Sequence, residues 1–151
     1  MEHLLARKLY DYLCRNSPDI ILRLDDKGMN EFIRSKIENA LPLLENLLVQ
    51  NCPAFIIEEL CMDQMTEDLK PSKYHYIVKI LEEEFEEKYN GFKETGLLTY
   101  EITNMIDRCK EVFEKFRFSV LTEEDRQLYY AVTGIIGAYF EEPLNTGVHG
   151  L

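Results

Sequence analysis

Five glutamates are concentrated in one short stretch of the sequence, residues 82–87 (EEEFEE). Residues four apart share a face of an α-helix, so Glu82 lies beside Glu86, and Glu83 beside Glu87. Carboxylates paired in this way could bind a metal ion, act as an acid–base pair or attract a basic partner. The phenylalanine within the run belongs to the apolar face of the same predicted helix, which turns the glutamates towards solvent. The pattern therefore favours a solvated acidic face, with a partner surface and a metal site as the weaker alternatives.

Histidines and cysteines form no pattern typical of catalysis or metal binding. None of the three histidines follows a glutamate by three residues, as a di-iron helical bundle would require. The four cysteines lack the two-residue spacing of zinc or redox motifs, and we expect them to be reduced, buried thiols rather than disulfides. Glycine-rich phosphate loops, nucleophile elbows and zinc-protease motifs are absent from the sequence. We therefore predict no catalytic residues, metal or cofactor; a site built from scattered residues is the alternative.

Tyrosines are abundant for a chain that has no tryptophan, with nine in all. In the pair Tyr129-Tyr130, and in Tyr10 and Tyr12, at least one ring points away from the predicted core stripe. A tyrosine at the rim of the core is the more common case. Tyrosine also suits surfaces that are apolar in body and polar at the tip, as protein interfaces are. We therefore add Tyr130 to Glu82, Glu83, Glu86 and Glu87 as a predicted partner surface.

The charge balance narrows the class of partner. Aspartate and glutamate outnumber lysine and arginine 28 to 17, which gives a formal net charge of −11. Nucleic acids are bound through basic side chains, so we expect no direct nucleic-acid binding. The expected partner is a basic protein or a second copy of this chain, as a homodimer. No apolar run approaches the ~18 residues of a membrane span, and the N-terminus has the reverse order of a signal peptide, so we predict a cytoplasmic protein.

Apolar residues recur at helical spacing along the whole chain, and no repeat or linker divides it. Thr122, followed by Glu123, Glu124 and Asp125, predicts a capped start for the last helix. Pro42 predicts a kink or division of the second helix, and Gly91 a stop for the fourth. The fold class is therefore all-α, one domain over 1–151 with short connections and a mobile tail at about 144–151. The six expected helices span about 2–15, 29–50, 53–66, 73–89, 99–116 and 122–141.

Three stretches of the sequence resemble a known protein family. The first is residues 9–13 (LYDYL) with the turn at 17–19 (SPD), and the second is 72–74 (SKY) with 77–81 and 84–85. The third is 109–113 (CKEVF) with Tyr129 and 133–136. The family is an uncharacterised all-helical domain of unknown function in Bacteroides-type bacteria, often carried near mobile or conjugative elements. The resemblance implies a helical fold and supplies no activity, cofactor or site residue.

Three functional hypotheses follow from the sequence. The first is a non-catalytic helical interaction module with an accessory or regulatory role. The second is an acidic antagonist that mimics DNA and fills the basic groove of a DNA-binding protein, with the glutamates of the acidic run in place of phosphates. The third is an enzyme whose site has no recognisable motif. The acidic surface, the surplus tyrosines and the missing catalytic patterns favour the first.

Overall fold

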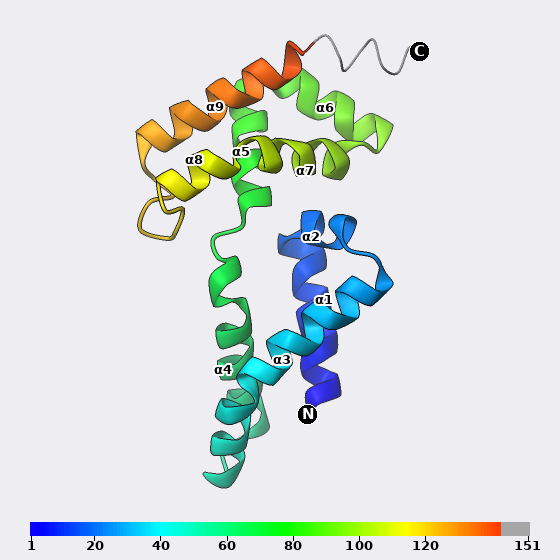
Figure 1. Ribbon diagram of the computed structural model, residues 1–151, viewed down its shortest axis with the longest axis vertical. Coiled ribbons are helices and arrows are strands. Elements are labelled where there is room, and N and C mark those ends of the chain that lie inside the picture. Colours follow the sequence, from blue (N-terminus) through cyan, green and yellow to red (C-terminus); the bar gives the residue numbers. More distant parts are fainter. Residues whose placement is uncertain (143–151) are drawn as a thin grey trace. The chain divides into compact units, whose positions relative to one another are not determined.

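A computed structural model describes residues 1–142, and within them it contains helices and no strand (Figure 1). The predicted all-α class is confirmed. The predicted helix number is too low, because these residues form nine α-helices and one short 3-10 helix. The turn after Pro18 is a helix of its own, and two of the predicted helices are each divided in two. The predicted mobile tail at 144–151 lies outside the described residues.

Contacts between residues divide the chain into two compact units, residues 1–72 and 73–151. The prediction of one domain stays a prediction, since this division concerns contacts and not independent folding. No helix among the described residues has both the length and the apolar content of a membrane span.

The N-terminal unit is built around a long helix pair. In Figure 1, α3 and α4 run alongside each other, and α1 packs on both. Apolar residues at helical spacing on these three helices form its core: Leu5, Leu9, Ala40, Leu44, Leu47, Ile57, Cys61 and Met65. The elements are α1 (Glu2–Asn16), α2 (Pro18–Arg23), α3 (Asp26–Val49), α4 (Ala54–Thr66) and η1 (Glu67–Leu69).

The helix α3 continues through Pro42, so the proline does not divide it. Pro42 is exposed, and water can bond the Glu38 carbonyl oxygen that the missing N–H leaves without a helical donor. At the start of the helix, the Asp25 side chain accepts a hydrogen bond from the Gly28 backbone N–H at 2.7 Å. This cap lets α3 begin three residues earlier than the apolar pattern indicates.

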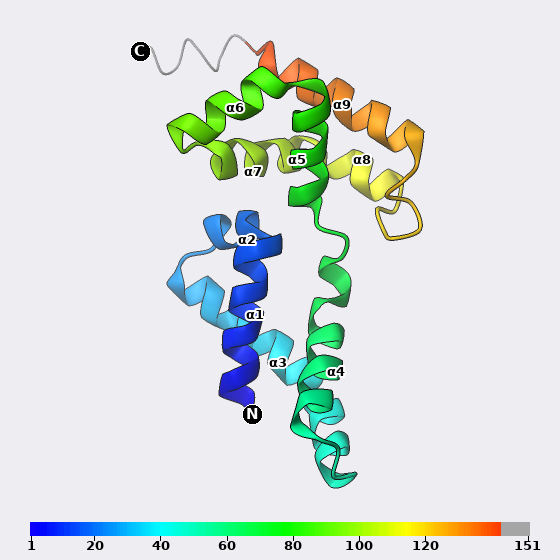
Figure 2. The same cartoon turned by 180° about the vertical axis from the view of Figure 1, so that it is seen from behind.

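The C-terminal unit contains five helices, and α5 contacts three of the others, α6, α7 and α9 (Figure 2). Its core is larger and rich in aromatic residues, with the Tyr76 ring edge-on to both Phe113 and Phe118. The elements are α5 (Lys73–Glu84), α6 (Glu86–Thr95), α7 (Leu98–Arg108), α8 (Lys110–Lys115) and α9 (Arg126–Phe140). The buried core residues are Tyr74, Tyr76, Ile77, Ile80, Leu81, Ile102, Met105, Ile106, Cys109, Phe113, Leu128, Val132, Ile136 and Tyr139.

Single residues divide the two predicted helices of this unit. Phe85, at φ −141° and ψ 49°, separates α5 from α6, and Cys109 separates α7 from α8. The ring of Phe85 packs edge-on against Phe140 at 5.2 Å, so a tertiary contact accompanies the break. Gly91 is inside α6, and the predicted stop at this glycine is wrong. The helix ends instead at Gly96, whose φ of 75° is the left-handed conformation typical of a C-terminal cap.

Candidate functional site

A cleft of about 320 Å³ lies beside the start of α9, within the C-terminal unit. Side chains of α5 form one wall, and the segment that leads into α9, with its first turn, forms the other. The lining combines phenol rings, carboxylates and two basic groups: Tyr76, Tyr129, Tyr130, Glu84, Glu123, Glu124, Asp125, Lys79 and Arg126. Carboxylates outnumber the basic groups four to two, and tyrosine rings attract cations through their π-faces. The cleft therefore complements a cation better than an anion.

Asp125 fixes the wall of the cleft by capping α9. Its carboxylate accepts hydrogen bonds from the backbone N–H groups of Gln127, at 2.7 Å, and Leu128, at 3.3 Å. Thr122 does not cap the helix, contrary to prediction, because its hydroxyl is engaged in the preceding turn. It accepts from the Ser119 N–H at 2.9 Å and donates to the Arg117 carbonyl at 3.0 Å. The helix therefore begins at Arg126, and the preceding acidic residues stay at the cleft.

Tyr129 connects the two walls. Its hydroxyl lies 2.8 Å from Glu83 Oε1 and 2.9 Å from Glu84 Oε2, so its single proton is donated to one or the other carboxylate. Burial first, and then these hydrogen bonds and negative charges, raise the pKa of the Tyr129 phenol. The contact brings the acidic run at 82–87 beside the acidic segment at 123–125, two stretches about forty residues apart in the sequence.

Tyr76 forms the buried part of the cleft lining. The residue is 9% exposed, and its hydroxyl has no hydrogen-bond partner. Burial, followed by the negative charges of Asp125 and Glu124, raises the pKa of Tyr76 to about 12, so the hydroxyl is near those carboxylates and stays protonated at neutral pH. An unpaired buried hydroxyl costs about 1–3 kcal/mol, and such a group is uncommon in a folded protein.

The structure places the predicted glutamates on the surface but changes how they are grouped. Glu82, Glu83, Glu86 and Glu87 are all exposed. The break at Phe85 lies between the members of each predicted pair, so Glu82–Glu86 and Glu83–Glu87 do not share one continuous helix face, contrary to prediction. Glu83 instead pairs with Glu84 around the Tyr129 hydroxyl.

Tyr130, which the sequence predicts as part of a partner surface, lines the cleft. It is 60% exposed, and its hydroxyl accepts a hydrogen bond from Arg126 at 3.2 Å. Its ring meets that of Tyr129 edge-on, with centroids 6.2 Å apart. The sequence reasoning missed Tyr76 and Lys79 as cleft residues. Burial of Tyr76 and Ile80, four residues apart, shows that α5 has a second buried face, and this spacing was the signal that could have revealed it.

Within residues 1–142, no group of three histidine, cysteine or acidic side chains is arranged to hold a metal ion. The four thiols are free: Cys61 and Cys109 are buried, Cys52 is half-buried and Cys14 is exposed. The predicted burial is therefore wrong for Cys14, which lies on the outer face of α1. Burial raises the pKa of Cys109 to about 12 and also raises that of Cys61. Neither buried thiol is therefore a nucleophile at neutral pH.

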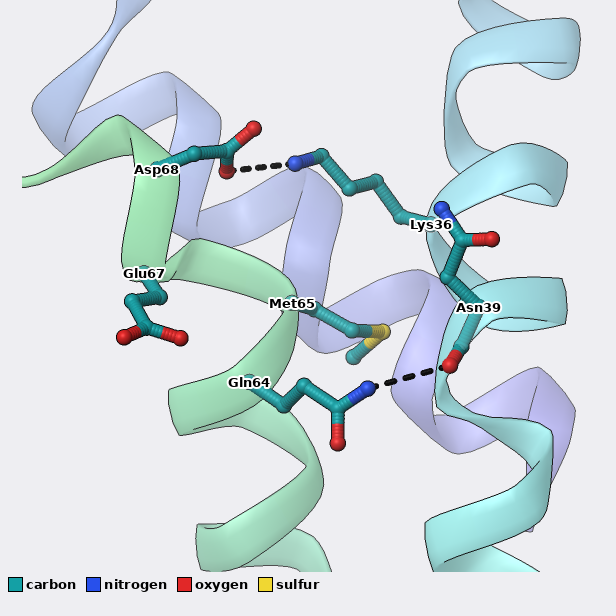
Figure 3. A pocket seen from close by; sticks show the side chains of 6 residues that line it. All are labelled: Lys36, Asn39, Gln64, Met65, Glu67 and Asp68. Carbon is teal, nitrogen blue, oxygen red and sulfur yellow. Dashed lines mark hydrogen bonds and ion pairs between the residues drawn. The ribbon is translucent and has the colours of Figure 1, made fainter.

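A second cleft, of about 270 Å³, lies in the N-terminal unit between α3 and the end of α4 (Figure 3). Two pairs of its polar groups are bonded to each other. The Lys36 ammonium lies 2.5 Å from Asp68 Oδ1, and the Gln64 amide donates to the Asn39 carbonyl at 3.0 Å. Met65 lies between these two links in Figure 3. These bridges hold α3 against α4 and leave few polar groups for a ligand.

Comparison with known proteins identifies a family for this chain but no activity. No curated protein and no solved structure matches the chain. The model of a family described as a domain of unknown function, DUF1896, matches residues 5–144 and so covers nearly the whole chain. This match confirms membership of an uncharacterised family, as the sequence resemblance implied. The chain belongs to the DUF1896 family.

Proposed function

We propose that the protein is a non-catalytic interaction module that binds a basic segment of a partner protein through the acidic surface of its C-terminal unit. The observation that carries the proposal is the Tyr129 contact with Glu83 and Glu84. Through it, two acidic segments that are separate in the sequence form one surface beside the cleft. Lysine and arginine side chains are the natural complement of that surface.

Exposure of the carboxylates supports this proposal. Glu82, Glu86 and Glu87 are exposed, as are Glu124 and Asp125 across the cleft. The nearby lysine Lys88 lies over the Phe140 ring, 5.4 Å from its centroid, and makes no ion pair with the glutamates around it. The acidic surface thus keeps a net negative charge that steers a basic segment towards it, most strongly at low salt.

The test uses a fluorescent peptide of alternating lysine and glycine and the full-length protein, with binding measured by fluorescence anisotropy. A triple variant, Glu82→Gln, Glu86→Gln and Glu87→Gln, removes three exposed charges without touching the glutamates that Tyr129 bonds. We expect it to weaken binding about fivefold or more, and to reduce the loss of affinity between about 50 and about 200 mM salt.

A matched variant separates the local surface from net charge. Glu31→Gln, Glu38→Gln and Glu45→Gln remove three exposed carboxylates from the N-terminal unit. We expect this control to keep the affinity within about twofold, since its charges are in the other unit. Equal losses in the two triple variants, or no binding of the peptide by the unmodified protein, would contradict the proposal.

The more specific sequence predictions belong to this proposal as well. They are an accessory or regulatory role, a cytoplasmic location, a bacterial lineage with a mobile-element context, and the homodimer as one form of the partnership. Sedimentation equilibrium of the purified protein tests the homodimer directly. No contact among residues 73–142 favours the DNA-mimic hypothesis or the enzyme hypothesis over the interaction module.

A further inference from the structure

Several polar groups in the cleft beside α9 have no hydrogen-bond or ion-pair partner within residues 1–142. The Tyr76 hydroxyl is buried without a partner. The carboxylates of Glu123 and Glu124 make no hydrogen bond or ion pair within residues 1–142, whereas Asp125 caps the helix and Glu84 accepts from Tyr129. Two free carboxylates and one free phenol oxygen thus line the same cavity, and all three groups accept hydrogen bonds.

The size of the cavity limits what can occupy it. A volume of about 320 Å³ is at the low end of the range for ligand sites, which suits one side chain better than a large cofactor. An anion would meet four carboxylates against two basic groups, and a neutral group would leave this excess of negative charge uncompensated. A cationic side chain supplies hydrogen-bond donors, a positive charge and a partner for the tyrosine rings at once.

We propose that this cleft binds the cationic end of one lysine or arginine side chain of the partner, with the Glu123 and Glu124 carboxylates as counter-charges and the Tyr76 hydroxyl as a hydrogen-bond acceptor. This inference rests on the proposed function. It adds which kind of partner side chain is the anchor and where on this protein that side chain binds. Arg126 is exposed at the rim. Entry of the cation to the buried hydroxyl requires its long side chain to rotate outward, while the Glu124 carboxylate stays beside the cation. The aliphatic stem of the partner's side chain then lies beside the rings of Tyr129 and Tyr130.

The decisive variant is Tyr76→Phe, because it removes one oxygen and changes no charge. It also keeps the ring that packs edge-on against Phe113 and Phe118. We expect the lysine–glycine peptide to bind about three- to tenfold more weakly, while the thermal midpoint of the full-length protein stays the same or rises. A merely structural hydroxyl would leave peptide affinity unchanged, and that result would overturn the proposal.

Two further measurements identify the occupant. The paired variant Glu123→Gln and Glu124→Gln should weaken binding, and a peptide with acetylated lysines should not bind, since its side chains carry no charge. An arginine–glycine peptide shows which cation the cleft prefers, and binding of either cationic peptide through Tyr76 supports the proposal. If calcium alone displaces the peptide at equal ionic strength, the cleft is a metal site and the proposal is wrong.

The same set of variants distinguishes the two proposals. Tyr10→Phe, at an exposed tyrosine of the N-terminal unit, is the matched control and should leave affinity unchanged. If the Glu82, Glu86 and Glu87 variant loses affinity while Tyr76→Phe does not, the acidic surface stands and the anchoring cleft is refuted. If neither variant changes affinity, both are refuted.

Discussion

At the scale of single residues, the Tyr129 hydroxyl is the group on which the candidate site depends. It is bonded to two carboxylates from another helix, at 2.8 and 2.9 Å, whereas the adjacent Tyr130 hydroxyl is bonded by Arg126 of its own helix. Hydrogen bonds to charged groups contribute more than neutral ones, and solvent screening reduces the contribution of exposed pairs. The two neighbouring tyrosines should therefore differ in their effect on stability.

Tyr129→Phe should lower the free energy of unfolding by about 1 kcal/mol, because Glu83 and Glu84 then face each other without the proton that they share. Urea unfolding followed by circular dichroism measures the change. Tyr130→Phe is the matched control, since the same atom is lost from a ring that is 60% exposed, and its effect should stay within about 0.5 kcal/mol. Equal effects from the two substitutions would show that the contact between the two helices contributes nothing.

At the scale of elements, the two glycines at Gly134 and Gly96 perform opposite roles. Gly134 is exposed inside α9, and a Cβ built there meets no atom within 4 Å. Gly96 ends α6 with φ 75°, where L-residues are strained although space is open. A glycine inside a helix is less favourable than alanine, while a glycine at a left-handed C-terminal cap is preferred.

Gly134→Ala should therefore raise the free energy of unfolding by about 0.5–1 kcal/mol, and Gly96→Ala should lower it by about 1 kcal/mol. The same urea titration measures both changes, and each variant is the control for the other, because the chemical change is identical. A loss of stability in Gly134→Ala would mean that a neighbour approaches this face of α9, as in the predicted association of the chain with a partner or with itself.

Element starts were more predictable from sequence than element breaks. Four helices begin within one residue of their predicted starts, at Glu2, Ala54, Lys73 and Leu98, because the signals that start a helix act within a few residues. The breaks at Phe85 and Cys109 have no such local signal. Phe85 leaves the helical conformation where its ring meets Phe140 and lies near Gly137, more than fifty residues further along the chain.

Some residues of the candidate site were predictable from the sequence, but their arrangement in space was not. The acidic run and Tyr130 were identified from residue type, and both lie at the acidic surface. The cleft itself depends on Tyr129 meeting Glu83 and Glu84 across more than forty residues, and no spacing in the sequence encodes that meeting. Tyr76 was missed because one apolar stripe was assigned to a helix that is buried on two sides.

At the scale of the whole molecule, the family match and the contact pattern describe different levels of organisation. The match runs from residue 5 to residue 144 and passes through the junction at residues 72 and 73 without interruption. The family match therefore covers parts of both compact units. Features of the N-terminal unit, such as the bridged cleft at Lys36 and Asp68, belong to the same family unit as the acidic surface.

Buried titratable groups should make the protein labile to alkali. The pKa of Cys109 is raised from 9.0, and those of Tyr76 and Tyr139 from 10.0, in each case to about 12, with burial as the largest cause. The unfolded chain therefore releases these protons at lower pH than the folded protein does. Their contribution to stability is complete below about pH 9 and is lost as the pH rises towards 12.

The free energy of unfolding should be constant from about pH 7 to 9 and then fall by about 1.4 kcal/mol per pH unit for each group that has ionised only in the unfolded chain. Urea midpoints measured at intervals of half a pH unit would show this decline. The onset belongs to the buried thiols Cys109 and Cys61, whose pKa values are both raised by burial from an ordinary 9.0, below that of the tyrosines. In the double variant Cys61→Ala and Cys109→Ala the decline should accordingly begin near pH 10, whatever the initial stability of the variant. General repulsion in a chain of net charge −11 would give the same onset in both proteins, and that result would contradict the assignment to the buried thiols.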